Sequence, residues 1–291
     1  LYDDRVYYSA VLLKNEKEKK DKRVLWSLNF DQLIWGPYSL KNHRTDSRDI
    51  VVQDSTNEIH YIGANGKVKW SKVLDGKILG RPLQIDAFQN NKFQFLFNTE
   101  KSIYALDILG NSLENFPITL PFSATNKVVA LDYDQNYNYR LLIALEDNRI
   151  YNYDLLGNFV LGWEKPLVKS PIHHAISHFA ISGLDYIFTI QDNGVVNLYN
   201  RKGQLRLGLK AKIDIPLGSD YFIEKSFNID SSAITFKNTQ GRISKYVFSS
   251  DEPIVMDDTA QQQALTTTLH ISNNRELFYC KKSKNTLKIV L

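Results

Sequence analysis

The stretch EDNRIYNYDLLGN, residues 146–158, contains the pattern that decides the fold. A polar turn at Glu146–Asn148 precedes alternating residues from Ile150 to Tyr153, and a second turn with Gly157 follows. Alternation with a period of two indicates a β-strand, and polar or glycine residues at both ends indicate tight turns. Similar stretches recur along the chain, which indicates an internal repeat.

The recurring stretches share one apolar residue after the polar turn, and this residue sets the period. The intervals between successive copies are 44, 47, 45, 48 and 44 residues, so the period is about 46. A glycine follows in four copies at nearly the same step, as expected for a turn that needs a positive φ. The apolar positions are Ile59, Ile103, Ile150, Val195, Ile243 and Leu287, and the glycines are Gly66, Gly110, Gly157 and Gly203.

Each repeat contains four short segments rich in the β-branched and aromatic residues that favour strands. Residues 127–168 show them as KVVALDYD, YRLLIAL, RIYNYDL and NFVLGWEKP, joined by polar or glycine turns. No window of a dozen residues keeps a helical periodicity. Four-stranded units with a period of roughly 40 to 50 residues are typical of a β-propeller, so the sequence predicts an all-β protein of this fold.

The number of blades follows from counting the expected strands. Six third strands are expected but only five fourth strands, so an N-terminal segment is needed to complete the last blade. RVLWSLNFD (23–31) matches KVKWSKVLD (67–75), with Trp26 and Trp70 44 residues apart. We therefore predict six four-stranded blades closed by this N-terminal strand, which would protect the sheet edges. Seven blades remain an alternative, because RVYYSAVLL (5–13) can form a further third strand.

The N-terminal residues are interpreted separately from the rest of the chain. We take residues 1–22 as the end of an upstream domain plus a charged linker, and 23–291 as the propeller. The linker, KNEKEKKDKR (14–23), mixes basic and acidic residues as solvated segments do. Leu1 is not a start methionine, so we expect a fragment that lacks its upstream part and any targeting segment. No apolar run approaches the roughly 20 residues that span a bilayer, so we expect no membrane insertion by this fragment.

The composition argues against several classes of protein. Hydrophobic residues make up 43% and charged residues 23%, as in globular proteins. The net charge of +4, from 36 basic and 32 acidic residues, is too small to predict a nucleic-acid partner. The single cysteine, Cys280, rules out an intramolecular disulfide and a cysteine metal cluster.

Two resemblances to known families bear on the fold and on the location of the protein. NGKVKWSKVLDG (65–76) resembles the repeat of quinoprotein-like propellers and of the outer-membrane assembly lipoprotein BamB. That resemblance covers one or two units and implies that Trp70 docks on the neighbouring blade. Residues 23–291 more closely resemble the C-terminal propeller of uncharacterised Bacteroidetes envelope proteins, a domain of unknown function. The second resemblance implies the fold and a periplasmic or cell-envelope location, and it implies no activity. The stretches that support it are LWSLNFDQLIWGP, IGANGKVKWSKVLDGKI and the run from Phe116 to Trp163.

The motifs of common enzymes are missing from the sequence. A quinone-cofactor dehydrogenase needs adjacent cysteines, and the chain has one cysteine. The boxes of sialidases, a GxSxG elbow and a phosphate-binding glycine loop are absent, since ANGK (64–67) is a hairpin turn. We therefore predict a non-catalytic protein-interaction or scaffold module of a bacterial envelope protein, without a cofactor. Its partner would be another envelope protein, beside the upstream domain; the alternative is a carbohydrate or small ligand in the central channel.

Candidate partner-binding residues come from two expected loops. DQLIWGPYSLKNHR (31–44) is predicted to lie between two strands and to present aromatic and polar side chains together, as an interaction surface needs. In the alternative, Trp35 wedges between blades. The second loop lies in IDAFQNNKFQFLFN (85–98). The predicted residues are Trp35, Tyr38, His43, Arg44, Asp86 and Phe88.

Two further stretches contain residue types that bind metals. LDYDQNYNYRLLIAL (131–145) resembles the calcium loop of integrin-type propellers, with Asp132, Asp134 and Asn136 as the candidate ligands. Arg140 takes the place of the final carboxylate and can neutralise the aspartates itself, so we favour a metal-free polar loop. IHHAISHF (172–179) gathers three histidines that could hold zinc, but no carboxylate lies close by in sequence to orient them.

Overall fold

The computed structural model describes the chain in several segments. They are Leu28, Phe30, and residues 34–256, 270–271, 277–283 and 286–290. The described residues form strands, turns and loops, and no helix occurs among them. They fall into two compact units, Leu1–Leu74 with Thr259–Leu291, and Asp75–Asp258. The predicted closing strand at 23–31, apart from Leu28 and Phe30, and the alternative strand at 5–13 lie outside the described residues.

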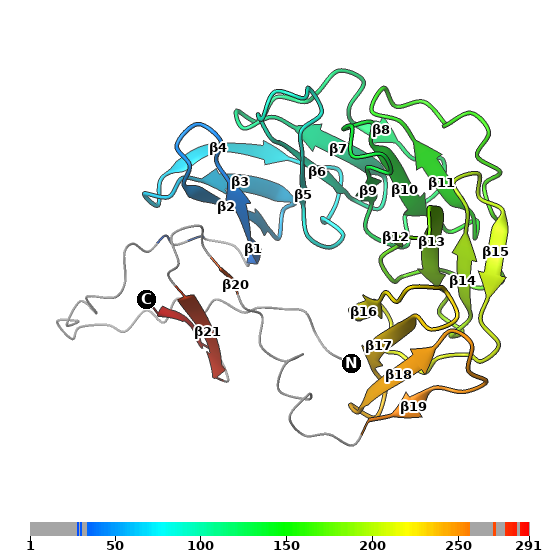
Figure 1. Cartoon of the computed structure of the whole chain (residues 1–291). Helices are drawn as coiled ribbons and strands as arrows, with labels where there is room; N and C mark the ends of the chain where they lie inside the picture. The colour runs from blue at the N-terminus through cyan, green and yellow to red at the C-terminus, as the bar shows by residue number, and fades with distance from the viewer. Residues whose placement is uncertain are drawn as a thin grey trace. The chain divides into compact units, whose positions relative to one another are not determined.

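The first unit contains one four-stranded and one three-stranded antiparallel sheet (Figure 1). The four-stranded sheet has the order β1 (Ile34–Lys41), β2 (Arg48–Asp54), β3 (Glu58–Ile62) and β4 (Val68–Val73). The three-stranded sheet has the order β20 (His270–Ile271), β21 (Leu277–Ser283) and β22 (Thr286–Val290).

The second unit contains four antiparallel sheets that follow one another along the chain (Figure 1). The first has β5 (Leu83–Ile85), β6 (Gln94–Asn98), β7 (Ser102–Leu106) and β8 (Ile118–Thr119). The second has β9 (Val129–Leu131), β10 (Arg140–Ala144) and β11 (Ile150–Tyr153). The third has β12 (Ser177–Ile181), β13 (Leu184–Ile190), β14 (Val196–Tyr199) and β15 (Leu205–Gly208). The fourth has β16 (Tyr221–Glu224), β17 (Ala233–Lys237), β18 (Ile243–Val247) and β19 (Ile254–Val255).

Each sheet of the second unit packs face to face on the next. Strand β10 shows how, because successive side chains of a strand point to opposite faces. Leu141 and Ile143 pack in the cluster shared with β5–β8, whereas Leu142 and Ala144 pack in the cluster shared with β12–β15. A third cluster joins β12–β15 to β16–β19. The central strands are therefore covered on both faces, which explains their continuous apolar runs.

The predicted repeat is confirmed by the strands and turns. The third strands of the six sheets are β3, β7, β11, β14, β18 and β22, and each begins at or beside one of the six apolar positions. The four turn glycines have positive φ, at 77° for Gly66, 86° for Gly110, 81° for Gly157 and 82° for Gly203. That the six sheets are six blades of a closed ring stays a prediction.

The predicted fourth strand NFVLGWEKP (158–166) is not a regular strand, because the chain bulges at Gly162, where φ is 82°. The indole N–H of Trp163 donates to the Ile150 carbonyl at 2.8 Å, so a side chain replaces a backbone donor at the bulge. Trp163 is buried in the cluster shared with the following sheet. Isolated bridges at the two ends pair Tyr153 with Phe159 and Arg149 with Leu167.

The predicted loop at 31–44 is wrong over most of its length, since Ile34–Lys41 is strand β1 and pairs with β2. The sequence Gly-Pro suggested a loop, but the ladder shifts its register between Trp35 and Tyr38, on either side of Pro37. Proline has no N–H to donate, and strands accept it at such irregularities.

Trp70, expected to dock on a neighbouring blade, stacks on Tyr61 of its own sheet. The ring centroids are 5.1 Å apart and the ring planes differ by 1°. The two residues are direct cross-strand partners on β4 and β3, where side chains lie close enough for aromatic stacking.

Candidate interaction face

Four loops of the second unit join the first strand of a sheet to its second strand, and they lie side by side. Gln89 Nε2 donates to the Asn136 carbonyl at 3.2 Å, and Ser182 Oγ donates to the Phe227 carbonyl at 3.2 Å. These bonds link the first loop to the second and the third to the fourth, so the loops share one end of their sheets. The loops are 86–93, 132–139, 182–183 and 225–232.

The first two of these loops are built alike. The carboxylate of Asp86 accepts the N–H groups of Asn90 at 3.0 Å and Asn91 at 2.7 Å. The Asp132 carboxylate accepts those of Asn136 at 3.0 Å and Tyr137 at 2.9 Å. Bonds from backbone N–H groups to a carboxylate are strong, so each aspartate holds its own loop closed.

The three predicted metal ligands, Asp132, Asp134 and Asn136, each bind a different group of the protein. Asp134 Oδ1 pairs with Arg201 at 2.7 Å, and the Asn136 side-chain oxygen accepts the N–H of Asn138 at 3.0 Å. The expectation that Arg140 neutralises the aspartates is wrong, because its guanidinium donates to the Asn138 side chain at 2.6 Å. Arg201, 67 residues from Asp134, takes that role instead.

Arg201 links the second and third loops through a charged network. Its Nε lies 2.5 Å from Asp185 Oδ2, and the other oxygen of Asp185 contacts His178 Nε2 at 2.7 Å. Burial raises the pKa of Asp185, but the bonds from Arg201 and His178 outweigh it and hold that pKa below its usual value. The guanidinium also lies over the Tyr133 ring, 4.7 Å from the centroid. These contacts fix the relative position of two neighbouring loops.

Around this network, each loop or its border exposes one large apolar side chain. Exposure is 61% for Phe88, 41% for Tyr137, 45% for Leu184 and 80% for Phe227. We call these four residues the apolar loop face. Single exposed apolar residues are ordinary, but one on each of four adjacent loops is typical of a contact surface.

The predicted partner-binding residues are divided between the two units. Phe88 is exposed on the apolar loop face, whereas the carboxylate of Asp86 is buried and closes the loop beneath it. Trp35 and Tyr38 lie on strand β1 of the first unit, half-buried. His43 and Arg44 lie in the turn beyond the far end of β1, so they do not form one patch with Trp35.

Sequence reasoning missed Tyr137, Leu184, Phe227 and Arg201. The first three could have been found by aligning the repeats on the loop after the first strand, since each such loop holds or borders an aromatic residue or leucine. Arg201 had no such signal, because its partners Asp134 and Asp185 are far from it in sequence and meet it only in the fold.

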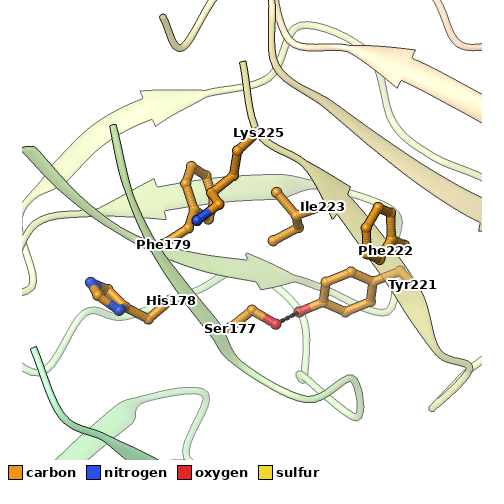
Figure 2. Close-up of a pocket in the computed structure, with 7 residues that line it drawn as sticks. All are labelled: Ser177, His178, Phe179, Tyr221, Phe222, Ile223 and Lys225. Atoms are coloured by element: carbon orange, nitrogen blue, oxygen red, sulfur yellow. Dashed lines mark hydrogen bonds between the residues drawn. The ribbon is translucent and has the colours of Figure 1, made fainter. Parts of the chain in front are cut away.

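A pocket of about 230 Å³ lies between β12 and β16, which are the first strands of the third and fourth sheets of the second unit (Figure 2). One wall contains Ser177, His178 and Phe179 of β12. The other wall is β16, where the Tyr221 hydroxyl donates to the Ala175 carbonyl at 2.5 Å and accepts from Ser177 at 2.8 Å. The remaining lining residues are Phe222, Ile223 and Lys225.

The three histidines of IHHAISHF point to different partners. His173 Nδ1 lies 2.6 Å from Asp192, and His178 binds Asp185. His174 is fully buried, and its Nδ1 donates to the Ser219 carbonyl at 3.2 Å, so in the neutral ring its Nε2 carries no proton. That nitrogen has no hydrogen-bond partner among the described residues. Burial lowers the pKa of His174, opposed by the Ser219 bond and the nearby Asp192.

This arrangement predicts that the protein loses stability in mild acid. The folded state keeps His174 neutral while the unfolded state takes up a proton below about pH 6.5, so stability falls as the pH falls through that value. The loss is at most about 1.4 kcal/mol for each pH unit. Thermal unfolding at pH 7.5 and 5.5 would measure it. We expect a smaller acid-induced decrease in Tm for His174→Gln, and equal decreases would contradict the prediction.

Comparison with known proteins supports the fold. No protein-family model matches the chain, and no curated protein sequence matches it. Among solved structures, the chain is similar to BBS1N in complex with ARL6DN, with a TM-score of 0.52 and 14% identity over 83% of this chain and 74% of the other. It is also similar to BamB from Moraxella catarrhalis, with a TM-score of 0.49 and 14% identity over 78% of this chain and 73% of the other.

These observations define the class of protein. The described residues are all-β, their antiparallel sheets repeat along the chain, and the BBS1N structure with the same fold is a β-propeller. The chain is therefore a β-propeller protein. In its described part there is no helix that could cross a bilayer.

Proposed function

We propose that this propeller is a non-catalytic interaction module and that its apolar loop face binds another protein. The observation that supports this most is the exposure of Phe88, Tyr137, Leu184 and Phe227 on four adjacent loops. Exposed aromatic side chains on a rigid scaffold are the residues that dominate protein–protein binding. The network of Arg201 stiffens this face, which lowers the entropy lost on binding.

The known fold is compatible with this role. The similar BBS1N structure is a complex with another protein, ARL6DN, so a propeller of this kind can bind a protein. A shared fold does not by itself imply a shared function, so the proposal rests on the exposed side chains of the apolar loop face. The proposed partner is a cell-envelope protein, and the envelope location and the Bacteroidetes origin rest on the sequence resemblance alone.

The absence of catalysis is part of the same proposal. Active sites need titrating groups with shifted pKa values that remain available for chemistry. On this face, the Asp185 carboxylate, whose pKa is lowered, is held by both Arg201 and His178. It serves to join two loops, which supports a structural use of the charges.

A second candidate is a small ligand or carbohydrate in the pocket between β12 and β16 (Figure 2). It is favoured by the aromatic Phe222, which is exposed, and by the cationic Lys225, both of which line the pocket. The pocket of about 230 Å³ is smaller than the roughly 300–1,000 Å³ usual for such sites. Asp86 and Asp132 do not support ligand binding, since the carboxylate of each holds its own loop closed.

The test is a cross-linking pull-down from an extract of the native organism, with the full chain as bait. We expect a partner recovered in stoichiometric amount by the wild type to be lost, at least tenfold, with Phe88→Ser, Tyr137→Ser and Phe227→Ser combined. The matched control combines Phe122→Ser and Leu217→Ser, two exposed residues in loops that enter first strands from the opposite end of the sheets. Equal recovery by both variants would contradict the proposal, and a partner lost only with the control would place the interface on the opposite face.

A further inference from the structure

We propose that Asp54, Glu58 and His60 in sheet β1–β4 form a binding site for one divalent ion of the zinc type. One ligand atom from each residue lies within 4.8 Å of the others. Asp54 ends β2, and the tight turn that follows leads directly into β3, which begins at Glu58. Glu58 and His60 are two residues apart on β3, so their side chains share a face of the sheet. The hairpin alone thus brings three potential ligands together.

The separation of His60 from Asp54 differs from that of the other histidine–aspartate pairs. His173 lies 2.6 Å from Asp192 and His178 lies 2.7 Å from Asp185, as charge-assisted hydrogen bonds do. His60 Nε2 lies 3.4 Å from Asp54 Oδ2. Tetrahedral zinc with bonds of roughly 2.0–2.1 Å separates two of its ligands by about 3.4 Å. The pair therefore has the spacing of two ligands of one ion.

The groups around the pair orient it for an ion. Asp54 Oδ1 accepts the N–H of Thr56 at 2.9 Å, the Thr56 hydroxyl at 2.7 Å and the N–H of Glu58 at 2.9 Å. These three bonds hold the Asp54 carboxylate in place, and its Oδ2 is the oxygen that faces His60 Nε2. Ser71 Oγ lies 2.7 Å from His60 Nδ1 and fixes the ring, as the hydrogen-bond partners of zinc-bound histidines do.

Charge and ligand type favour a zinc-like ion over calcium. Two carboxylates lie close together, and no described residue forms a hydrogen bond or ion pair with the Glu58 carboxylate. A cation between them would remove their repulsion. An imidazole nitrogen suits zinc, whereas calcium needs six to eight oxygen ligands. Three protein ligands leave a fourth tetrahedral position for water.

The experiment uses the full chain, stripped of metal with a chelator and titrated with ZnCl₂ against a chromophoric competitor. We expect one equivalent of Zn²⁺ to bind the wild type. Glu58→Gln and His60→Gln should each weaken the affinity by about tenfold or more, since each removes a ligand. The matched control is His173→Gln, which removes a histidine from another histidine–aspartate pair and should leave the affinity unchanged.

Glu58→Gln is isosteric and changes a half-buried side chain, so we expect the variant to fold. Circular dichroism would check its folding, so that a loss of Zn²⁺ binding can be told from a loss of structure. The absence of saturable Zn²⁺ binding in the wild type would overturn the proposal. An equal loss with His173→Gln would also overturn it, because binding would then be adventitious. Binding of CaCl₂ in place of ZnCl₂ would overturn the assignment of a zinc-like ion.

Discussion

Replacing Trp163 with alanine is expected to lower the free energy of unfolding by about 3–5 kcal/mol. The side chain is only 8% exposed and packs where the sheet of β9–β11 meets that of β12–β15. Its truncation leaves a cavity between two sheets. It also removes the indole N–H that the Ile150 carbonyl accepts, and a buried group left without its partner adds to the loss.

Urea denaturation followed by circular dichroism would measure this. Leu161→Ala is the matched control, because Leu161 lies two residues away in the same irregular segment and is fully exposed. We expect it to change the stability by less than about 0.5 kcal/mol. Trp163→Phe keeps most of the packing and loses the N–H, so it should fall between the two. If Trp163→Ala is no worse than Leu161→Ala, Trp163 does not join the sheets.

The repeat could be predicted from sequence because its signals are local. A strand needs only alternating residues, and a tight turn needs only a polar run or a glycine such as Gly157. Both signals lie within a dozen residues, and each recurs along the chain with a period of about 46 residues. The third strands and the positive φ of the turn glycines were therefore predictable.

Two irregular segments were not predictable because tertiary contacts override the local pattern. Pro37 sits inside strand β1, where a shifted register tolerates it, although a Gly-Pro pair commonly marks a loop. The segment 158–166 is rich in the aromatic and aliphatic residues that favour strands, yet it bulges, and Trp163 packs against the next sheet. Both conformations depend on contacts with residues that are distant in sequence.

The candidate site was predictable only in fragments for the same reason. Phe88 was found from an exposed-looking loop, but Asp86 was assigned to a partner when its carboxylate closes that loop. Asp132 and Asp134 have the spacing of metal ligands, but each binds another group. Asp132 accepts an N–H of its own loop, and Asp134 pairs with Arg201, which is distant in sequence. Sequence spacing shows which groups can meet, and the fold decides which of them do.

Replacing Gly194 with alanine is expected to destabilise the protein by about 4 kcal/mol, among the largest effects of a single methyl group. Gly194 has φ of 82°, and an added Cβ would lie 2.3 Å from the Ile213 carbonyl oxygen and 3.1 Å from its nitrogen. Both atoms belong to backbone, which cannot swing aside as a side chain can. The Ile213 N–H also donates to the Gly194 carbonyl at 2.9 Å, so relieving the clash would break this bond.

Gly183→Ala separates steric overlap from backbone strain. Gly183 has φ of 75°, close to that of Gly194, but no atom lies within 4 Å of its added Cβ. It should therefore cost only the strain of a left-handed residue, about 1–2 kcal/mol. Urea denaturation of the two variants gives the difference directly. A gap of about 2 kcal/mol or more would show that the turn at Gly194 is locked against the segment at Ile213, which leads into β16. Equal losses would mean that this segment moves freely away from the turn and does not hold neighbouring sheets together.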